Sequence, residues 1–199
     1  DAARQAAGRD GIGEVGVIDT LSASCGEGLL AMVAAEAAMQ GMTADEVEAL
    51  VLDLIPKTRV FGVADDVRYA VLGGRVPGWV RTLTRALHVN PVLTASPEGK
   101  VGAAGAHPGR GANPKRLART LVRKMEADVM YRVLISHANN PEGARLARQQ
   151  ILQNHGRIHS CHVTDARPAL GAHFGPGGLI AAFTPQPEAL ERMAPRGRS

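Results

Sequence analysis

The chain has few of the residues that stabilise secreted, metal-binding or membrane proteins. Its 199 residues include two cysteines, Cys25 and Cys161, which lack the Cys-x-x-Cys spacing of a zinc or redox motif. No apolar run approaches the roughly 20 residues needed to span a bilayer. The amino-terminal residues do not combine a basic segment with an apolar one, as a signal peptide would. We therefore expect a cytoplasmic protein with no transmembrane segment.

Aromatic residues are also scarce, at 3% of the chain. The formal net charge is +4, with 23 basic and 19 acidic side chains. Nucleic-acid binding usually combines a focused basic patch with aromatic side chains that stack on bases. The most basic stretch, residues 110–124, is interpreted mainly as the solvated face of an amphipathic helix, although such a face can also dock an acidic partner or nucleic acid. We expect no nucleic-acid partner.

The pattern of apolar residues predicts an α/β protein. A hairpin around Pro97 requires antiparallel neighbours, so the sheet is expected to be mixed and flanked by helices. Residues 29–40 are apolar nearly all round, which predicts a buried helix. The expected strands cover 14–19, 59–64, 90–94, 96–101, 130–136, 157–164 and 179–183, and the expected helices cover 29–40, 43–55, 67–72, 79–88, 114–127 and 141–155.

The first candidate binding segment joins the predicted strand 14–19 to the apolar helix. It is rich in small residues, and it includes Ser22, Ser24 and Gly26. A loop that leads into the amino terminus of a helix can hold an anion, because free backbone N–H groups and the helix dipole point there. Residues 20–28 are therefore a candidate site for a carboxylate or a phosphate.

Two further candidates are flanked by glycines. Arg75 follows Gly73-Gly74, and His173 stands in a predicted loop over 171–178 that includes Gly175. Glycines permit close approach of a ligand, and a guanidinium or an imidazole can bind an anion there. The spacing supports a structural role equally well, in which Arg75 bridges nearby acidic or carbonyl groups and His173 satisfies a turn.

Two other patterns are rejected. The letters Gly-x-Gly-x-x-Gly at 11–16 precede the predicted strand, whereas a dinucleotide fingerprint follows a strand and opens a helix. His155, His159, Cys161 and His162 lie within eight positions, but alternation along a strand points them to different faces. We therefore expect neither a nicotinamide cofactor nor a metal site.

Taken together, five motifs in order resemble the DegV family of bacterial fatty-acid-binding proteins. The motifs are Val17-Ile-Asp-Thr20 with Ser24-Cys-Gly-Glu-Gly28, then Leu72-Gly-Gly-Arg75, Asn90-Pro-Val-Leu93, Ile135-Ser-His-Ala138 and His173-Phe-Gly-Pro-Gly177. The resemblance runs across residues 14–183.

This resemblance implies a two-lobed DegV-like fold that encloses one long-chain fatty acid. It also implies a partner, a dihydroxyacetone-kinase-like fatty-acid kinase, either separate or fused, to which the acyl carboxylate is presented for acyl-phosphate formation in lipid metabolism. The family's Gly-Gly-Arg and His-x-Gly-Pro-Gly motifs lie near the carboxylate, and they correspond here to Arg75 and His173. The chain would then bind lipid without catalytic residues or a cofactor of its own. Aliphatic residues expected to line the tunnel are Val63, Val71, Leu72, Leu93, Leu179 and Ile180.

Members of the family begin with a further stretch that nothing before Gly13 resembles. We therefore expect a piece of a longer polypeptide, with residues 1–42 as the closing strand and helix of an incomplete first lobe, 43–184 as the carboxyl-terminal lobe and 185–199 as a tail. The apolar segment 15–40 would lack sheet neighbours, which could favour a homodimer.

A second hypothesis is a small-molecule enzyme. It would bind a carboxylate or phosphate at the start of the helix, over Ser22–Gly28, with His173 as general acid or base. This hypothesis requires one pocket that joins the two segments, and it predicts turnover without a partner protein.

Overall fold

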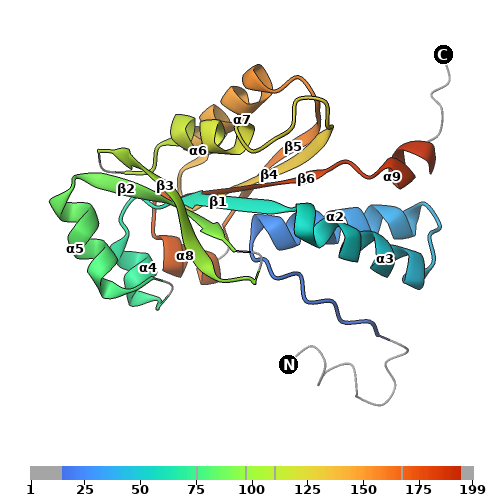
Figure 1. The fold of residues 1–199 in the computed structure, drawn as a ribbon, viewed down its shortest axis with the longest axis horizontal. Coiled ribbons are helices and arrows are strands. Elements are labelled where there is room, and N and C mark those ends of the chain that lie inside the picture. The colour runs from blue at the N-terminus through green and yellow to red at the C-terminus, as the bar shows by residue number, and fades with distance from the viewer. Residues whose placement is uncertain (1–14, 75, 97, 110, 167, 194–199) are drawn as a thin grey trace.

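The computed structural model describes residues 15–74, 76–96, 98–109, 111–166 and 168–193. They form a six-stranded sheet in the order β3-β2-β1-β6-β4-β5 (Figure 1). Strands β4 and β5 pair in parallel and the other neighbours are antiparallel, which confirms the mixed sheet. The strands are β1 (Arg59–Val63), β2 (Val89–Ala95), β3 (Val101–Pro108), β4 (Tyr131–His137), β5 (Ile158–Asp165) and β6 (Leu179–Pro185).

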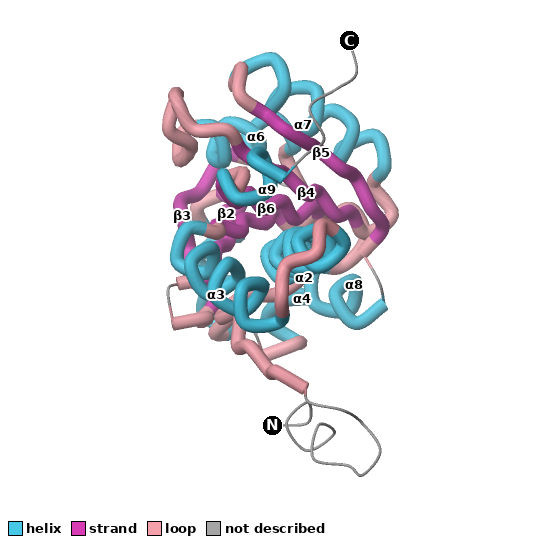
Figure 2. Tube along the Cα trace, turned by 90° about the vertical axis from the view of Figure 1, so that its right-hand side faces the viewer, coloured by secondary structure: helices cyan, strands magenta, loops and turns pink. Residues whose placement is uncertain are grey.

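Helices cover both faces of the sheet. Helices α6 and α7 lie on one face, and α2 lies on the other with α3 beside it (Figures 1 and 2). None of the described helices is long and apolar enough to cross a membrane. The helices are α2 (Cys25–Met39), α3 (Ala44–Leu54), α4 (Arg68–Leu72), α5 (Gly78–Ala86), α6 (Pro114–Val122), α7 (Pro141–Asn154), α8 (Pro168–Phe174) and α9 (Glu188–Met193), with a 3₁₀ turn over Ile55–Lys57.

Two central strands, β4 and β6, are buried on both faces, which accounts for the apolar runs 133–135 in β4 and 179–183 in β6. On one face, Val133 and Ile135 pack against the buried sides of α6 and α7. On the other face, Leu134 and Ile180 pack against α2. The expected amphipathic helix is α6, which buries Leu117 and Leu121.

Side-chain caps fix where several helices begin. Thr43 accepts a hydrogen bond from the backbone N–H of Glu46, and the Glu46 carboxylate accepts one from the backbone N–H of Thr43 at 2.8 Å. Asn113 and Asn140 accept hydrogen bonds from backbone N–H groups at the starts of α6 and α7. These caps satisfy donors that have no partner within the helix.

The strand predicted over 14–19 is wrong in its described part. Residues 15–20 form no strand, and α2 begins at Cys25 instead of at residue 29. A β-branched run becomes a strand only when a neighbouring strand supplies hydrogen bonds, and no described segment pairs with this one.

Helix α2 is buried on one face only, which corrects the expectation that it is buried all round. Leu29, Val33 and Ala37 are buried against the sheet and α3. Met32 and Met39, by contrast, are 39% and 88% exposed. The uncovered side of α2 is therefore apolar as well.

A partly buried ion pair connects α2 to the sheet. The Arg132 side chain on β4 is only 5% exposed, and its guanidinium donates to the two carboxylate oxygens of Glu36 on α2 at 2.5 and 3.0 Å. It also donates to the side-chain oxygen of Gln186. The hydrogen bond from Arg132 is the main reason why the pKa of Glu36 lies below its usual value.

We expect Glu36→Ala to lower the free energy of unfolding at pH 7 by about 1–3 kcal/mol, because it leaves a buried guanidinium without its carboxylate. This loss is smaller than the loss usual for a fully buried ion pair, because the Glu36 side chain is 37% exposed. Urea titrations of both proteins measure the difference.

The same difference should depend on pH. The folded-state pKa of Glu36 is lowered, so its stabilisation is complete above the unfolded carboxyl pKa of about 4.3 and is lost as the pH falls through the folded value. Glu142→Ala, which removes an exposed ion pair with Arg145, is the control and should change stability by less than about 0.5 kcal/mol. Equal losses from the two substitutions would contradict this account.

Candidate functional site

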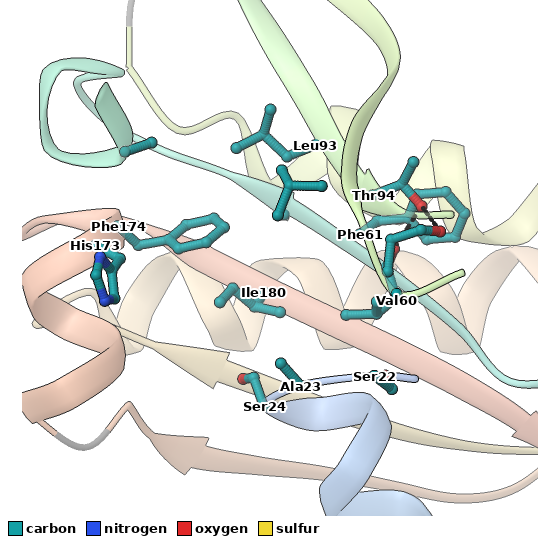
Figure 3. A pocket seen from close by; sticks show the side chains of 15 residues that line it. Ser22, Ala23, Ser24, Val60, Phe61, Leu93, Thr94, His173, Phe174 and Ile180 are labelled. Atoms are coloured by element: carbon teal, nitrogen blue, oxygen red, sulfur yellow. Dashed lines mark hydrogen bonds between the residues drawn. The ribbon is translucent and has the colours of Figure 1, made fainter. Parts of the chain in front are cut away.

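An apolar pocket of about 170 Å³ opens on the α2 side of the sheet (Figure 3). Strands β1, β2 and β6 form its floor, the residues just before α2 form one rim, and the end of α8 forms another. The lining residues are Ser22, Ala23, Ser24, Val60, Phe61, Gly62, Ala70, Leu93, Thr94, Ala95, Gly99, Val101, His173, Phe174 and Ile180.

The pocket has few polar groups. The Thr94 hydroxyl donates to the backbone carbonyl of Val60 at 2.8 Å, so its proton is already engaged. His173 is the one titratable side chain among the described lining residues. The walls therefore suit an apolar ligand, and His173 and the two serines supply polar contacts at the rim.

His173 lies in helix α8, so the loop predicted over 171–178 is wrong for residues 171–174, whereas residues 175–178 do lie outside the helix. Its imidazole packs against Gly73, where a Cβ would overlap Nδ1. The Nδ1 atom is buried and has no hydrogen-bond partner among the described residues. An unpaired buried nitrogen is costly, and this one is enclosed against Gly73.

The structure therefore brings two of the predicted motifs together. Gly73, from the Gly-Gly-Arg motif, ends α4 and touches His173, from the last motif. Arg75 itself lies outside the described residues, so its predicted role stays a prediction.

Ser22 and Ser24 line the pocket as well. In Figure 3, Ser24 lies nearer to His173 than Ser22 does. Ser24 has φ of +56°, an unusual backbone conformation for a residue with a side chain, and its hydroxyl donates to the Cys25 sulfur at 3.8 Å. Backbone strain of this kind often occurs at binding sites.

Gly26 and Gly175 do not line the pocket but make room for residues beside it. A Cβ at Gly26 would overlap the Ser22 hydroxyl. A Cβ at Gly175 would overlap the Tyr69 ring, and Gly175 has φ of +70°, which favours glycine. Gly26 and Gly175 therefore help to position the residues at the rim of the pocket.

Only some of the predicted tunnel residues line the pocket. Leu93 and Ile180 do so, whereas Val63 and Leu179 pack in the core on the opposite face of the sheet and Leu72 is 81% exposed. The sequence reasoning missed Val60 and Phe174. Val60 alternates with the core-facing Phe61 along β1, and strand periodicity could have identified it.

The Cys25 thiol lies behind the rim and is chemically protected. It is 1% exposed and donates to the backbone carbonyl of Ile180 at 3.5 Å. Burial raises its pKa to about 12, so it is not a thiolate at neutral pH. Cys25 therefore contributes packing and not a nucleophile.

Comparison with known proteins identifies the class. The family model described as "Uncharacterised protein, DegV family" matches residues 1–185, and the chain belongs to this family. A DegV domain-containing protein of Streptococcus pyogenes is 29% identical over 164 residues, which are 82% of this chain and 56% of that protein. The chain thus spans little more than half the length of this curated relative.

Solved structures show the same fold. A fatty-acid-binding DegV family protein of Thermus thermophilus matches with a TM-score of 0.77 at 24% identity, covering 93% of this chain and 64% of that one. The Streptococcus pneumoniae fatty acid kinase B3 protein, loaded with linoleic acid, matches with a TM-score of 0.74 at 19% identity, covering 88% and 61%. These likenesses confirm the DegV-like α/β fold.

We expect Gly73→Ala to displace His173, because the added methyl would occupy the position of the imidazole. The free energy of unfolding should fall by about 1–3 kcal/mol, as in other overpacked sites. Chemical denaturation measures this loss.

Gly78→Ala is the matched control, because a Cβ there meets no atom within 4 Å, and it should be close to neutral. In the double variant of Gly73→Ala with His173→Ala, most of the Gly73→Ala loss should disappear, since the overlapping ring is gone. Additive losses in the double variant would show that the two residues do not interact.

Proposed function

We propose that the chain binds a long-chain fatty acid, with acyl carbons in the apolar pocket and the carboxylate beside His173. The observation that carries this proposal is an apolar pocket with one titratable side chain, the His173 imidazole, among its described lining residues. An imidazole N–H can donate to a carboxylate, and a hydrogen bond to a charged group is stronger than one between neutral groups.

The remaining polar groups fit the same ligand. Ser24 lines the pocket, and its hydroxyl donates only to the Cys25 sulfur at 3.8 Å, a weak acceptor that a carboxylate oxygen can replace. Thr94 offers no free proton, because it already donates to Val60. The polar end and the apolar end of the pocket are therefore distinct, as an amphipathic ligand requires.

The volume of the pocket limits how many carbons of the acyl chain it can enclose. A protein cavity of about 150 Å³ binds a benzene molecule, which has six carbons. A pocket of about 170 Å³ therefore encloses only part of a long acyl chain. Since the chain spans 56% of one curated relative, polypeptide beyond these residues is proposed to cover the rest.

A partner kinase belongs to the proposal. The fatty acid's carboxylate would be presented to a fatty-acid kinase, separate or fused, that forms the acyl phosphate. In support, a structural neighbour from Streptococcus pneumoniae bears the name of a fatty acid kinase B protein. Arg75 is proposed to assist at the carboxylate on the strength of the Gly-Gly-Arg motif.

The pocket also joins the two segments that the enzyme hypothesis requires, because Ser22, Ser24 and His173 all line it. Acid–base catalysis usually needs a second polar group to orient or assist the imidazole. The described lining residues offer no second titratable side chain, so the binding function is the better supported of the two.

The test is native mass spectrometry of the chain, and of any longer polypeptide that contains it, followed by extraction and lipid analysis. We expect a stoichiometric fatty acid on the wild-type protein. In His173→Ala, occupancy should fall about tenfold, because the carboxylate loses a charge-assisted hydrogen bond.

His137→Ala is the matched control, because His137 is a buried histidine on β4 outside the pocket lining. It should keep the lipid. The proposal fails if no fatty acid binds to either form of the wild-type protein, and turnover of a small molecule without any partner would support the enzyme hypothesis instead.

A further inference from the structure

The ring of Phe174 occupies the part of the pocket next to His173. Phe174 is the last residue of α8 and directly follows His173. Both side chains line the pocket, and in Figure 3 the Phe174 ring extends from α8 over the apolar floor near Ile180. A ligand that contacts both His173 and the apolar floor therefore lies beside the Phe174 ring.

Gly62 on β1 holds this ring in place by having no side chain. A Cβ at position 62 would lie 2.5 and 2.7 Å from two ring carbons of Phe174 and 3.4 Å from Ile180. Real Cβ atoms do not approach so closely, so the ring occupies the space that any other residue at 62 would fill. At the base of the side chain, a Cβ at Gly178 would lie 3.1 Å from the Phe174 Cβ, so Gly178 leaves room where the side chain leaves the backbone.

Gly62 therefore leaves the space that the ring occupies, and Phe174 is itself among the residues that line the pocket. A third residue, Ile180, contributes to the floor beneath it and is 5% exposed. A packed aromatic ring gives way less readily than an aliphatic chain, because it is rigid and has few rotamers. The ring therefore limits the space that a ligand can use beside it.

We propose that Phe174, whose ring packs against Gly62, makes the pocket select acyl chains by their width close to the carboxylate. This inference rests on the proposed function, since it places the carboxylate beside His173. Straight acyl chains pass the ring, whereas a methyl branch on the first carbons meets it. Branches far from the carboxylate lie beyond the ring and are not discriminated by it.

The experiment is a competition monitored by native mass spectrometry. Equimolar hexadecanoic acid and 3-methylhexadecanoic acid compete for the protein, and a second mixture pairs hexadecanoic acid with 15-methylhexadecanoic acid. One methyl group in an apolar pocket changes affinity by about tenfold or more. We expect the wild-type protein to prefer the straight chain by about tenfold over the 3-methyl acid, and by far less over the 15-methyl acid.

The two key variants should act in opposite directions. Phe174→Ala opens the passage, so the preference against the 3-methyl acid should fall by about fivefold or more. Gly62→Ala pushes the ring toward the pocket, so that preference should increase or the 3-methyl acid should cease to bind. Neither variant should change the ratio for the 15-methyl acid by more than about twofold.

Matched controls separate selection from loss of packing. Phe183→Leu removes an aromatic ring from the core on the other face of the sheet, and Gly102→Ala adds a methyl on β3 where a Cβ meets no atom within 4 Å. Both should keep the wild-type ratios. Phe174→Leu is the milder variant if Phe174→Ala does not fold, and it should shift the ratio in the same direction.

The outcomes distinguish the two proposals. If the wild-type protein binds no fatty acid, both are overturned. If it binds fatty acids but shows no preference against the 3-methyl acid, or if the two ratios shift equally in Phe174→Ala, the selection by Phe174 is overturned and the binding function stands.

Discussion

The close approach of α8 to its neighbours is the constraint on which the site depends. Two glycines permit it: Gly62 leaves room for the Phe174 ring, and Gly73 leaves room for the His173 imidazole. A side chain at either position would displace α8, because packed interiors have little free volume. The positions of His173 and Phe174 in the pocket lining follow from these two contacts.

The sheet supplies the rigid floor for this arrangement. Strands β1 and β6 pair through five residues, from Arg59 with Phe183 to Val63 with Leu179, and they place Gly62 beside Ile180. The ion pair between Arg132 and Glu36 fixes α2 against the same sheet, and the start of α2 carries Ser24 to the rim. Elements far apart in the sequence are thus held in register by backbone pairing and one partly buried charge pair.

Much of the fold could be predicted because the signals are local. The box of Thr43 and Glu46 marks the start of a helix, and β-branched runs mark the buried strands. Predictions that depend on a distant partner were less successful. Residues 15–20 have the composition of a strand but no described neighbour to pair with, and the glycines around His173 favoured a loop although tertiary contacts hold α8 as a helix.

The residues of the candidate site also divide into those that a local pattern identifies and those that depend on a distant partner. The sequence pointed to His173, Ser22 and Ser24, because histidine and serine near glycines are typical of anion sites. Phe174 was missed as a pocket residue, since its position depends on Gly62, which no local pattern connects to it. Domain boundaries and the role of Arg75 remain predictions, and the latter lies outside the described residues.

The central claim is that the carboxylate of a fatty acid binds beside His173 while its first carbons pass Phe174. A crystal structure of the protein with hexadecanoic acid tests it most directly. The account predicts a carboxylate oxygen within hydrogen-bond distance of the His173 imidazole and an acyl chain between Phe174 and Ile180. A carboxylate at the Thr94 end of the pocket, or an acyl chain bound elsewhere on the protein, would contradict it.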